Sequence, residues 1–161
     1  SMWNRKNQKG QSIVEITLVT PLLLIALYIP ADFGIAFLMA HLTQNAVREG
    51  ARIGSGLANP FGNSEANTVK NEVFDRMPSD SLVTSQNVTV RFYSGTTCLE
   101  FVEVSATGTY NFFLYQLLRI FGLSAPDTAT ITRATQMRYN YQPNTNNPPC
   151  ATATTFGPFT N

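Results

Sequence analysis

The sequence predicts an α+β protein, in which one long N-terminal helix is followed by a small antiparallel-sheet head with short helices. Three observations carry this prediction. A run from Ile13 to Ala40 is almost entirely apolar. Two segments, 87–94 and 98–110, alternate apolar and polar residues as half-buried strands do, and the turn sequence Ser-Gly-Thr-Thr joins them. Helix-period apolar residues recur elsewhere, so helices and antiparallel strands share one chain.

The apolar run has the length of a membrane span. No charged residue lies between Glu15 and Asp32, and a helix from Ile16 to Ala40 would measure roughly 38 Å, enough to cross a bilayer with some tilt. A cleaved secretory signal and a buried core helix are the alternatives. The run is too long for the first, and it lacks the polar face typical of the second. We therefore expect a span at about residues 13–40.

The flanks of this span predict its orientation. Arg5, Lys6 and Lys9 precede it, whereas the residues just after Ala40 carry no fixed positive charge. The positive-inside rule then places the N-terminus in the cytoplasm and the rest of the chain outside. Pro21 and Pro30 lie within the span, where they indicate either a simple kink or a locally melted segment.

The long helix is expected to cover residues 11–55. After the span its pattern becomes amphipathic, and one stripe is predicted to carry Ile35, Leu38, Leu42 and Ala46. Glycines at 50, 54 and 56 are predicted to weaken the helix and end it in a loop.

The head is expected to cover residues 56–141. It would hold a helix at 64–77 with Ser64 as N-cap and with Val69 and Val73 on one face. The hairpin follows, then a short apolar helix at 112–122 and a last strand at 128–141. Residues 142–161 form a tail rich in Pro, Asn and Thr that has no core of its own.

Composition and motifs argue against several function classes. The 11 Lys and Arg nearly balance the 10 Asp and Glu, so nothing indicates a nucleic-acid partner. No metalloprotease, nucleophile-elbow, phosphate-loop or Cys-x-x-Cys motif occurs. His41 is the only histidine and has no second metal ligand near it. We therefore expect no enzyme activity, no catalytic residues, no cofactor and no metal site.

The N-terminal residues resemble a known signal. Ser1 is interpreted as a cloning residue ahead of Met2, and residues 1–10 form a short basic leader that ends in Gly10. Glu15 follows, then the apolar helix. This arrangement resembles the class III (prepilin) signal, which a prepilin peptidase cuts after the glycine. Gln11 would become the first residue and Glu15 the fifth.

Further motifs extend the resemblance over about residues 10–52. They are Gly-Gln-Ser-x-Val-Glu, Thr-Pro-Leu-Leu-Leu, Asp-Phe-Gly and Gln-Asn-Ala-x-Arg-Glu-Gly-Ala-Arg, in this order. Together they resemble the TadE family of pilin-like proteins from Tad (tight adherence, Flp-type IVb) pilus systems.

The resemblance implies a pilin-like fold and a role in pilus assembly and surface adhesion. Major Flp-type pilins are short and mostly helical, whereas this head has roughly a hundred residues. The resemblance therefore implies a minor pilin or pseudopilin. Its implied partners are other pilins, the assembly platform of the bacterial inner membrane and the prepilin peptidase. The protein would be held in that membrane with a periplasmic head; whether it enters, primes or caps the fibre stays open. The alternative is a single-span periplasmic binding module that no prepilin peptidase processes.

Two acidic residues have competing interpretations. In the resemblance, Glu15 pairs with the free α-amine of a neighbouring subunit, since an unpaired carboxylate in apolar surroundings is costly. Its alternative is solvation at the headgroup boundary. Asp32 is expected either at the outer interface, where water reaches it, or against an Arg or Lys of another pilin or of an assembly protein.

The two cysteines, Cys98 and Cys150, have no metal-ligand spacing. If the head lies outside the cytoplasm, an even cysteine count favours one disulfide. Such a bond would tie the tail back across the sheet and let Phe156 and Phe159 cover apolar surface. A free tail with two reduced thiols is the alternative.

Overall fold

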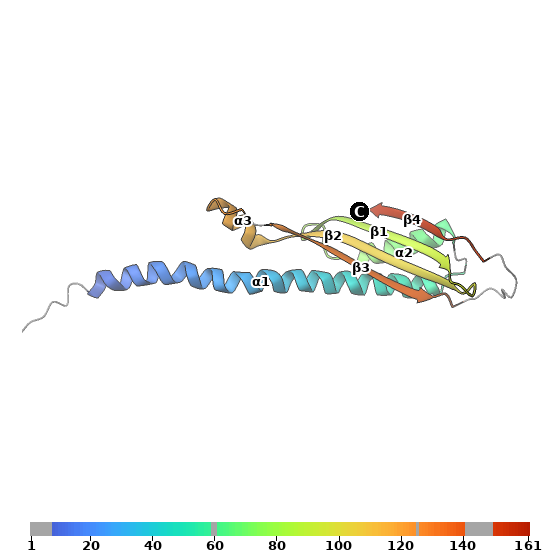
Figure 1. Cartoon of the computed structure of the whole chain (residues 1–161), viewed down its shortest axis with the longest axis horizontal. Helices are drawn as coiled ribbons and strands as arrows, with labels where there is room; N and C mark the ends of the chain where they lie inside the picture. The colour runs from blue at the N-terminus through green and yellow to red at the C-terminus, as the bar shows by residue number, and fades with distance from the viewer. Residues whose placement is uncertain (1–7, 59–60, 125, 141–149) are drawn as a thin grey trace, which may run out of the picture.

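The computed structural model describes residues 8–58, 61–124, 126–140 and 150–161. The first residues of the expected leader and residues 142–149 of the expected tail lie outside these ranges. One long helix runs the length of the molecule, and a four-stranded antiparallel sheet covers only its C-terminal half (Figure 1). The predicted α+β class, with a long N-terminal helix and a small sheet, is confirmed.

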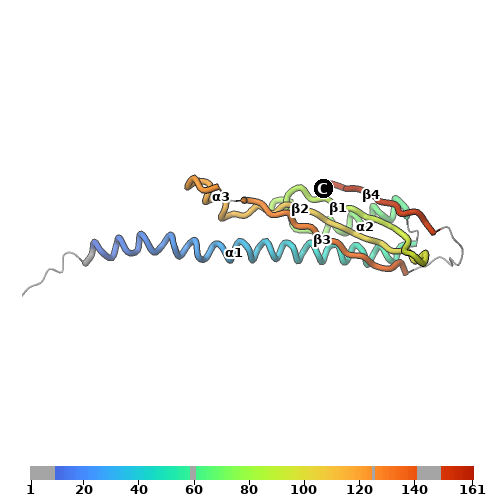
Figure 2. The backbone as a smooth tube through the Cα atoms, viewed as in Figure 1, coloured from blue at the N-terminus to red at the C-terminus, as the bar shows by residue number. Residues whose placement is uncertain are grey.

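Helix α1 (Gln8–Ser55) is continuous through both internal prolines, Pro21 and Pro30. The locally melted segment that the prolines allowed is therefore not present. The Thr17 hydroxyl donates to the Ile13 carbonyl at 2.7 Å, one turn below the carbonyl that Pro21 leaves without a donor. The first half of α1 has no strand beside it, and among the described elements only α3 lies near the end of that half (Figure 2).

The second half of α1 packs through a different stripe from the predicted one. Ile35, Leu38 and Leu42 are exposed, and only Ala46 of that set is buried. The buried stripe is made of smaller residues at helical spacing: Ala40, Thr43, Val47, Gly50, Ala51 and Gly54. The prediction failed because it ranked side chains by apolarity, whereas close approach of a sheet selects small ones.

Gly50 and Gly54 are packing residues rather than helix terminators. A Cβ at Gly50 would lie 2.4 Å from Cγ2 of Val73, and one at Gly54 would lie 3.0 Å from Cγ2 of Val69. The helix continues past both and ends at Ser55, where the predicted helix ends.

Helix α2 (Asn63–Arg76) lies beside α1 under the strand β1. Val69 and Val73 are fully buried against α1, as their spacing predicts. The residue at the N-cap is Gly62 and not the predicted Ser64, and no side chain caps this end. Exposed ion pairs such as Arg76 with Glu72 line the outer surface, where they add little stability.

The sheet has the order β3-β2-β1-β4, with every pair antiparallel. Its strands are β1 (Val83–Ser94), β2 (Glu100–Asn111), β3 (Thr128–Arg138) and β4 (Thr154–Thr160). Alternate residues of β1 and β2 are buried against the helices, among them Val88, Val90, Phe92, Val102 and Val104. The core of the head is thus one layer of side chains between the sheet and two helices.

The end of the expected tail forms a strand that the sequence did not predict. β4 pairs with β1, and Phe156 packs against the buried cluster that contains Phe92. The Lys70 ammonium group lies over the ring of Phe159, 5.2 Å from the ring centroid. β3 is therefore not the last strand, and the Pro/Asn/Thr-rich tail ends inside the fold.

Candidate site for membrane anchoring and assembly

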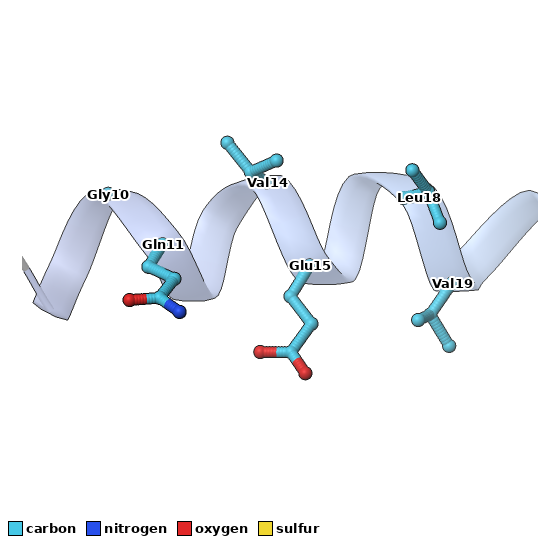
Figure 3. A pocket seen from close by; sticks show the side chains of 6 residues that line it. All are labelled: Gly10, Gln11, Val14, Glu15, Leu18 and Val19. Carbon is cyan, nitrogen blue, oxygen red and sulfur yellow. The ribbon is translucent and has the colours of Figure 1, made fainter.

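The residues of the predicted leader site lie on the first turns of α1. Gln11 and Glu15 are one turn apart and project from the same side of the helix (Figure 3). Both are exposed, and nothing lies within 4 Å of a Cβ placed at Gly10. Within the part of the chain that the structure describes, Glu15 makes no hydrogen bond or ion pair. This surface is free to meet another molecule.

Large apolar side chains surround this acidic residue and continue up the helix. From Ile13 to Ile29 they are between 42% and 68% exposed, because little of the described chain packs against them. A core helix would bury such residues, so that alternative is excluded for this stretch. An uncovered apolar surface of this size needs an apolar surrounding. α1 has the length and the composition of a single membrane span.

Asp32 marks the point where α1 enters the head, and its carboxylate has three partners in its own chain. The Tyr110 hydroxyl donates to Oδ1 at 3.0 Å. The backbone N–H groups of Phe113 and Leu114 donate to Oδ1 and Oδ2 at 3.2 and 2.9 Å. The side chain is buried, with Asp32 only 6% exposed.

Asp32 is buried rather than open to water, and its three partners come from its own chain, which neither interpretation included. Asp32 instead caps helix α3 (Phe113–Ile120), whose N-cap residue Phe112 has no side-chain acceptor. A carboxylate satisfies the free amides of a helix N-terminus and interacts favourably with the helix dipole.

Tyr110 is the site residue that sequence analysis missed. Burial raises its pKa to about 12, and the hydrogen bond and negative charge of Asp32 contribute to the same shift. The hydroxyl therefore stays protonated and donates throughout the physiological pH range. A signal for this cluster was present, since an apolar helix start without a capping residue needs an acceptor from elsewhere in the chain.

The two cysteines are joined in a disulfide, with their Cα atoms 4.9 Å apart. Cys98 lies in the turn between β1 and β2 rather than at the start of a strand, where the sequence pattern placed it. Cys150 comes shortly before β4. The bond therefore holds the tail at the end of the hairpin, far along the sheet from Asp32.

No group of three or more His, Cys, Asp or Glu side chains that could hold a metal ion is found among the described residues. His41 is exposed and lies edge-on to the ring of Phe37, at 5.0 Å between centroids. The arrangement combines an apolar helix, an exposed carboxylate near its N-terminal end and a packed head.

Comparison with known protein families gives a match for the first part of the chain. Residues 10–52 match the model of the family described as TadE-like protein, so this segment of the chain is TadE-like. The resemblance inferred from the motifs is confirmed over those residues. The match covers α1 from Gly10 to Arg52 and stops before α2 and the sheet. No curated protein and no solved structure matches the chain.

Proposed function

We propose that this protein is a minor pilin or pseudopilin of a Tad pilus system, supporting pilus assembly and adhesion. α1 would hold it in the bacterial inner membrane with the N-terminus in the cytoplasm and the head in the periplasm. A prepilin peptidase would cut between Gly10 and Gln11. Two observations support the proposal: the TadE-like match of residues 10–52 and the size of the head, which far exceeds that of the short major pilins.

The observation that carries the assembly role is the position of Glu15. This carboxylate is exposed on an apolar helix and has no partner among the described residues. In an apolar bundle an unpaired carboxylate is costly, so an arrangement that supplies an ammonium group is favoured. The α-amine that cleavage would create at Gln11 of a neighbouring subunit is such a group.

The helix geometry sets a stagger between the two subunits. Gln11 and Glu15 are four residues apart, which corresponds to roughly 6 Å along the helix axis. A neighbour's first residue would reach Glu15 if the two helices were parallel and offset by about one turn. Glu15 would thereby fix the register of packing, while the apolar side chains around it provide the contact area.

The test is Glu15→Val in a host that expresses the cognate peptidase and the other pilus components. We expect normal cleavage and membrane insertion, because the span becomes more apolar, but loss of co-assembly with the other pilins. Ser12→Val is the matched control, since Ser12 is also exposed and lies less than one turn away. It should assemble as the unsubstituted protein does.

The outcomes separate the candidate functions. Unchanged assembly of Glu15→Val would overturn the pairing role and leave Glu15 as a solvated residue at the headgroup boundary. Mass spectrometry of the mature protein gives a second result. A chain that keeps its leader through Gly10 in the presence of active peptidase would refute the pilin-like processing and favour the membrane-anchored binding module.

A further inference from the structure

Helix α3 presents an apolar surface that nothing in the described chain covers. Phe113, Leu117 and Ile120 follow one another at the spacing of one helix face, and Phe121 adjoins them. Ile120 is 79% exposed and Phe121 is 75% exposed. The polar residues Gln116 and Arg119 lie outside this face. A short helix with so many exposed apolar side chains is unfavourable in water.

The position of α3 relative to α1 is fixed by contacts at its start. Asp32 binds the first two amides of α3, and the ring of Phe113 lies 6.5 Å from that of Tyr28, one turn nearer the N-terminus of α1. α3 therefore extends from the level of Asp32 toward the apolar half of α1. Figure 1 shows it beyond the end of the sheet, beside the part of α1 that the sheet leaves bare.

Helix length gives the depth of this region in a bilayer. A hydrocarbon core of about 30 Å takes roughly 20 helical residues. A span that starts at Ile13 would end close to Asp32, and Tyr28 would lie about 6 Å below the boundary. Above it, Met39 and Ala40 are buried beneath the head, so the expected span of residues 13–40 overlaps a part of α1 that is already packed on one face.

We propose that α3 is a second membrane contact: a short helix that lies in the outer leaflet beside α1, with its apolar face against lipid acyl chains. The inference rests on the membrane span in the proposed function. Its apolar face continues the exposed apolar surface of α1, where Leu27 and Tyr28 are also uncovered. Arg119, which pairs with Asp127 outside the apolar face, would lie at the anionic headgroups.

The contact would fix the orientation of the head. A head attached to the membrane through α1 alone can rotate and tilt in the membrane together with that helix. A second insertion point at the same depth would set which face of the sheet looks along the membrane and which looks away. Asp32 would then have two roles in one place, since it caps α3 and holds it at the height where lipid begins.

The experiment places single tryptophans in the full chain and reconstitutes it in vesicles of phosphatidylcholine and phosphatidylglycerol with brominated acyl chains. Trp3→Phe removes the only native tryptophan. Phe121→Trp then reports on α3, Leu24→Trp on the span and Tyr93→Trp on the far end of β1. We expect strong quenching and blue-shifted emission for Phe121→Trp and Leu24→Trp, with none for Tyr93→Trp. Matching thermal midpoints would show that the three variants fold alike.

Each result assigns α3 to one environment. Unquenched emission at Phe121→Trp, with Leu24→Trp quenched, overturns the inference and leaves the span intact. Blue-shifted but unquenched emission at Phe121→Trp also overturns it, because a protein surface or a second copy would then cover α3. Quenching at Phe121→Trp alone overturns the span and, with it, the inference that α3 lies beside a spanning helix. Quenching at neither position overturns both.

Discussion

The two halves of α1 are similarly continuous as helices but serve different surroundings. Before Asp32, leucine and isoleucine dominate, and their side chains are at least 42% exposed. After it, most of the buried positions hold Ala, Ser, Thr, Val or Gly, and Met39 is the one large side chain among them. Small residues let a sheet and a second helix approach the backbone closely. Large branched residues suit contact with lipid chains or with other copies of a helix. Side-chain size, more than apolarity, separates the half that packs within the chain from the half that does not.

The comparison predicts that the stability of the head depends on its own bonds and not on the span. The largest effect is expected for Cys150→Ser, which opens the link between residues separated by 52 positions. Closing a loop of this size contributes about 4 kcal/mol in the chain-entropy model. The thermal midpoint of the head should fall clearly, and β4 should lose protection against hydrogen exchange first. Membrane insertion and leader cleavage should not change.

Reduction provides the control for this prediction. A reductant should lower the midpoint of the unsubstituted protein to that of Cys150→Ser and leave the variant where it is. Thiol labelling under denaturing, non-reducing conditions gives a direct check. Two reactive thiols per chain in protein taken from the periplasm would contradict the bond and the prediction together.

The second prediction compares the same substitution at two glycines of α1, one packed against α2 and one with no neighbour nearby. Gly50→Val places side-chain atoms where Cγ2 of Val73 already lies 2.4 Å from the added Cβ. Such overpacking costs about 1–3 kcal/mol. Gly34→Val meets nothing within 4 Å, so it should leave the head unaffected. Thermal unfolding of both variants in the same detergent measures the difference, and equal midpoints would show that Gly50 is not a packing residue.

The sequence predicts those elements of the fold that depend on residues close together along the chain. The long helix, α2 and the β1–β2 hairpin were predictable because each depends on a periodicity within a few turns. β4 was not, since Gly157 and Pro158 interrupt it and its pairing partner is far away in sequence. An edge strand tolerates a proline that a central strand would exclude, but a single sequence does not reveal where the edge lies.

In the candidate site, too, only the residues close together along the chain could be predicted. Gly10, Gln11 and Glu15 could be selected because their spacing is local. The partners of Asp32 are 78 to 82 residues away along the chain, and nothing near Asp32 indicates them. The only local indication is that Phe112, at the N-cap of α3, has no side-chain acceptor, so that the acceptor for the first amides of α3 must come from elsewhere in the chain. That hint does not choose among the acidic residues of the chain.

The third prediction concerns this junction between the two halves. In Asp32→Asn one carboxylate oxygen becomes an amide donor, which then faces a donor at Tyr110 or α3. Leaving a buried donor unsatisfied costs about 1–3 kcal/mol. We expect faster hydrogen exchange at Phe113 and Leu114 and a modest decrease in the thermal midpoint. Tyr110→Phe removes only one of the three bonds, so its effect should be smaller, and a larger effect in that variant would contradict the capping role.

The smallest effect is expected at Glu100, the first residue of β2, which is only 6% exposed. Burial raises the pKa of this carboxyl above 4.5, so the folded head holds the proton more tightly than the unfolded chain. The resulting stability is fully present below the unfolded pKa and is lost as the pH rises through the folded one. Glu100→Gln does not ionise. Its thermal midpoint should therefore exceed that of the unsubstituted protein at pH 7, by an amount that shrinks as the pH falls toward 4. Melting both proteins in detergent across that pH range measures the difference, and a constant difference would mean that burial of the charge at the start of β2 does not limit the stability of the head.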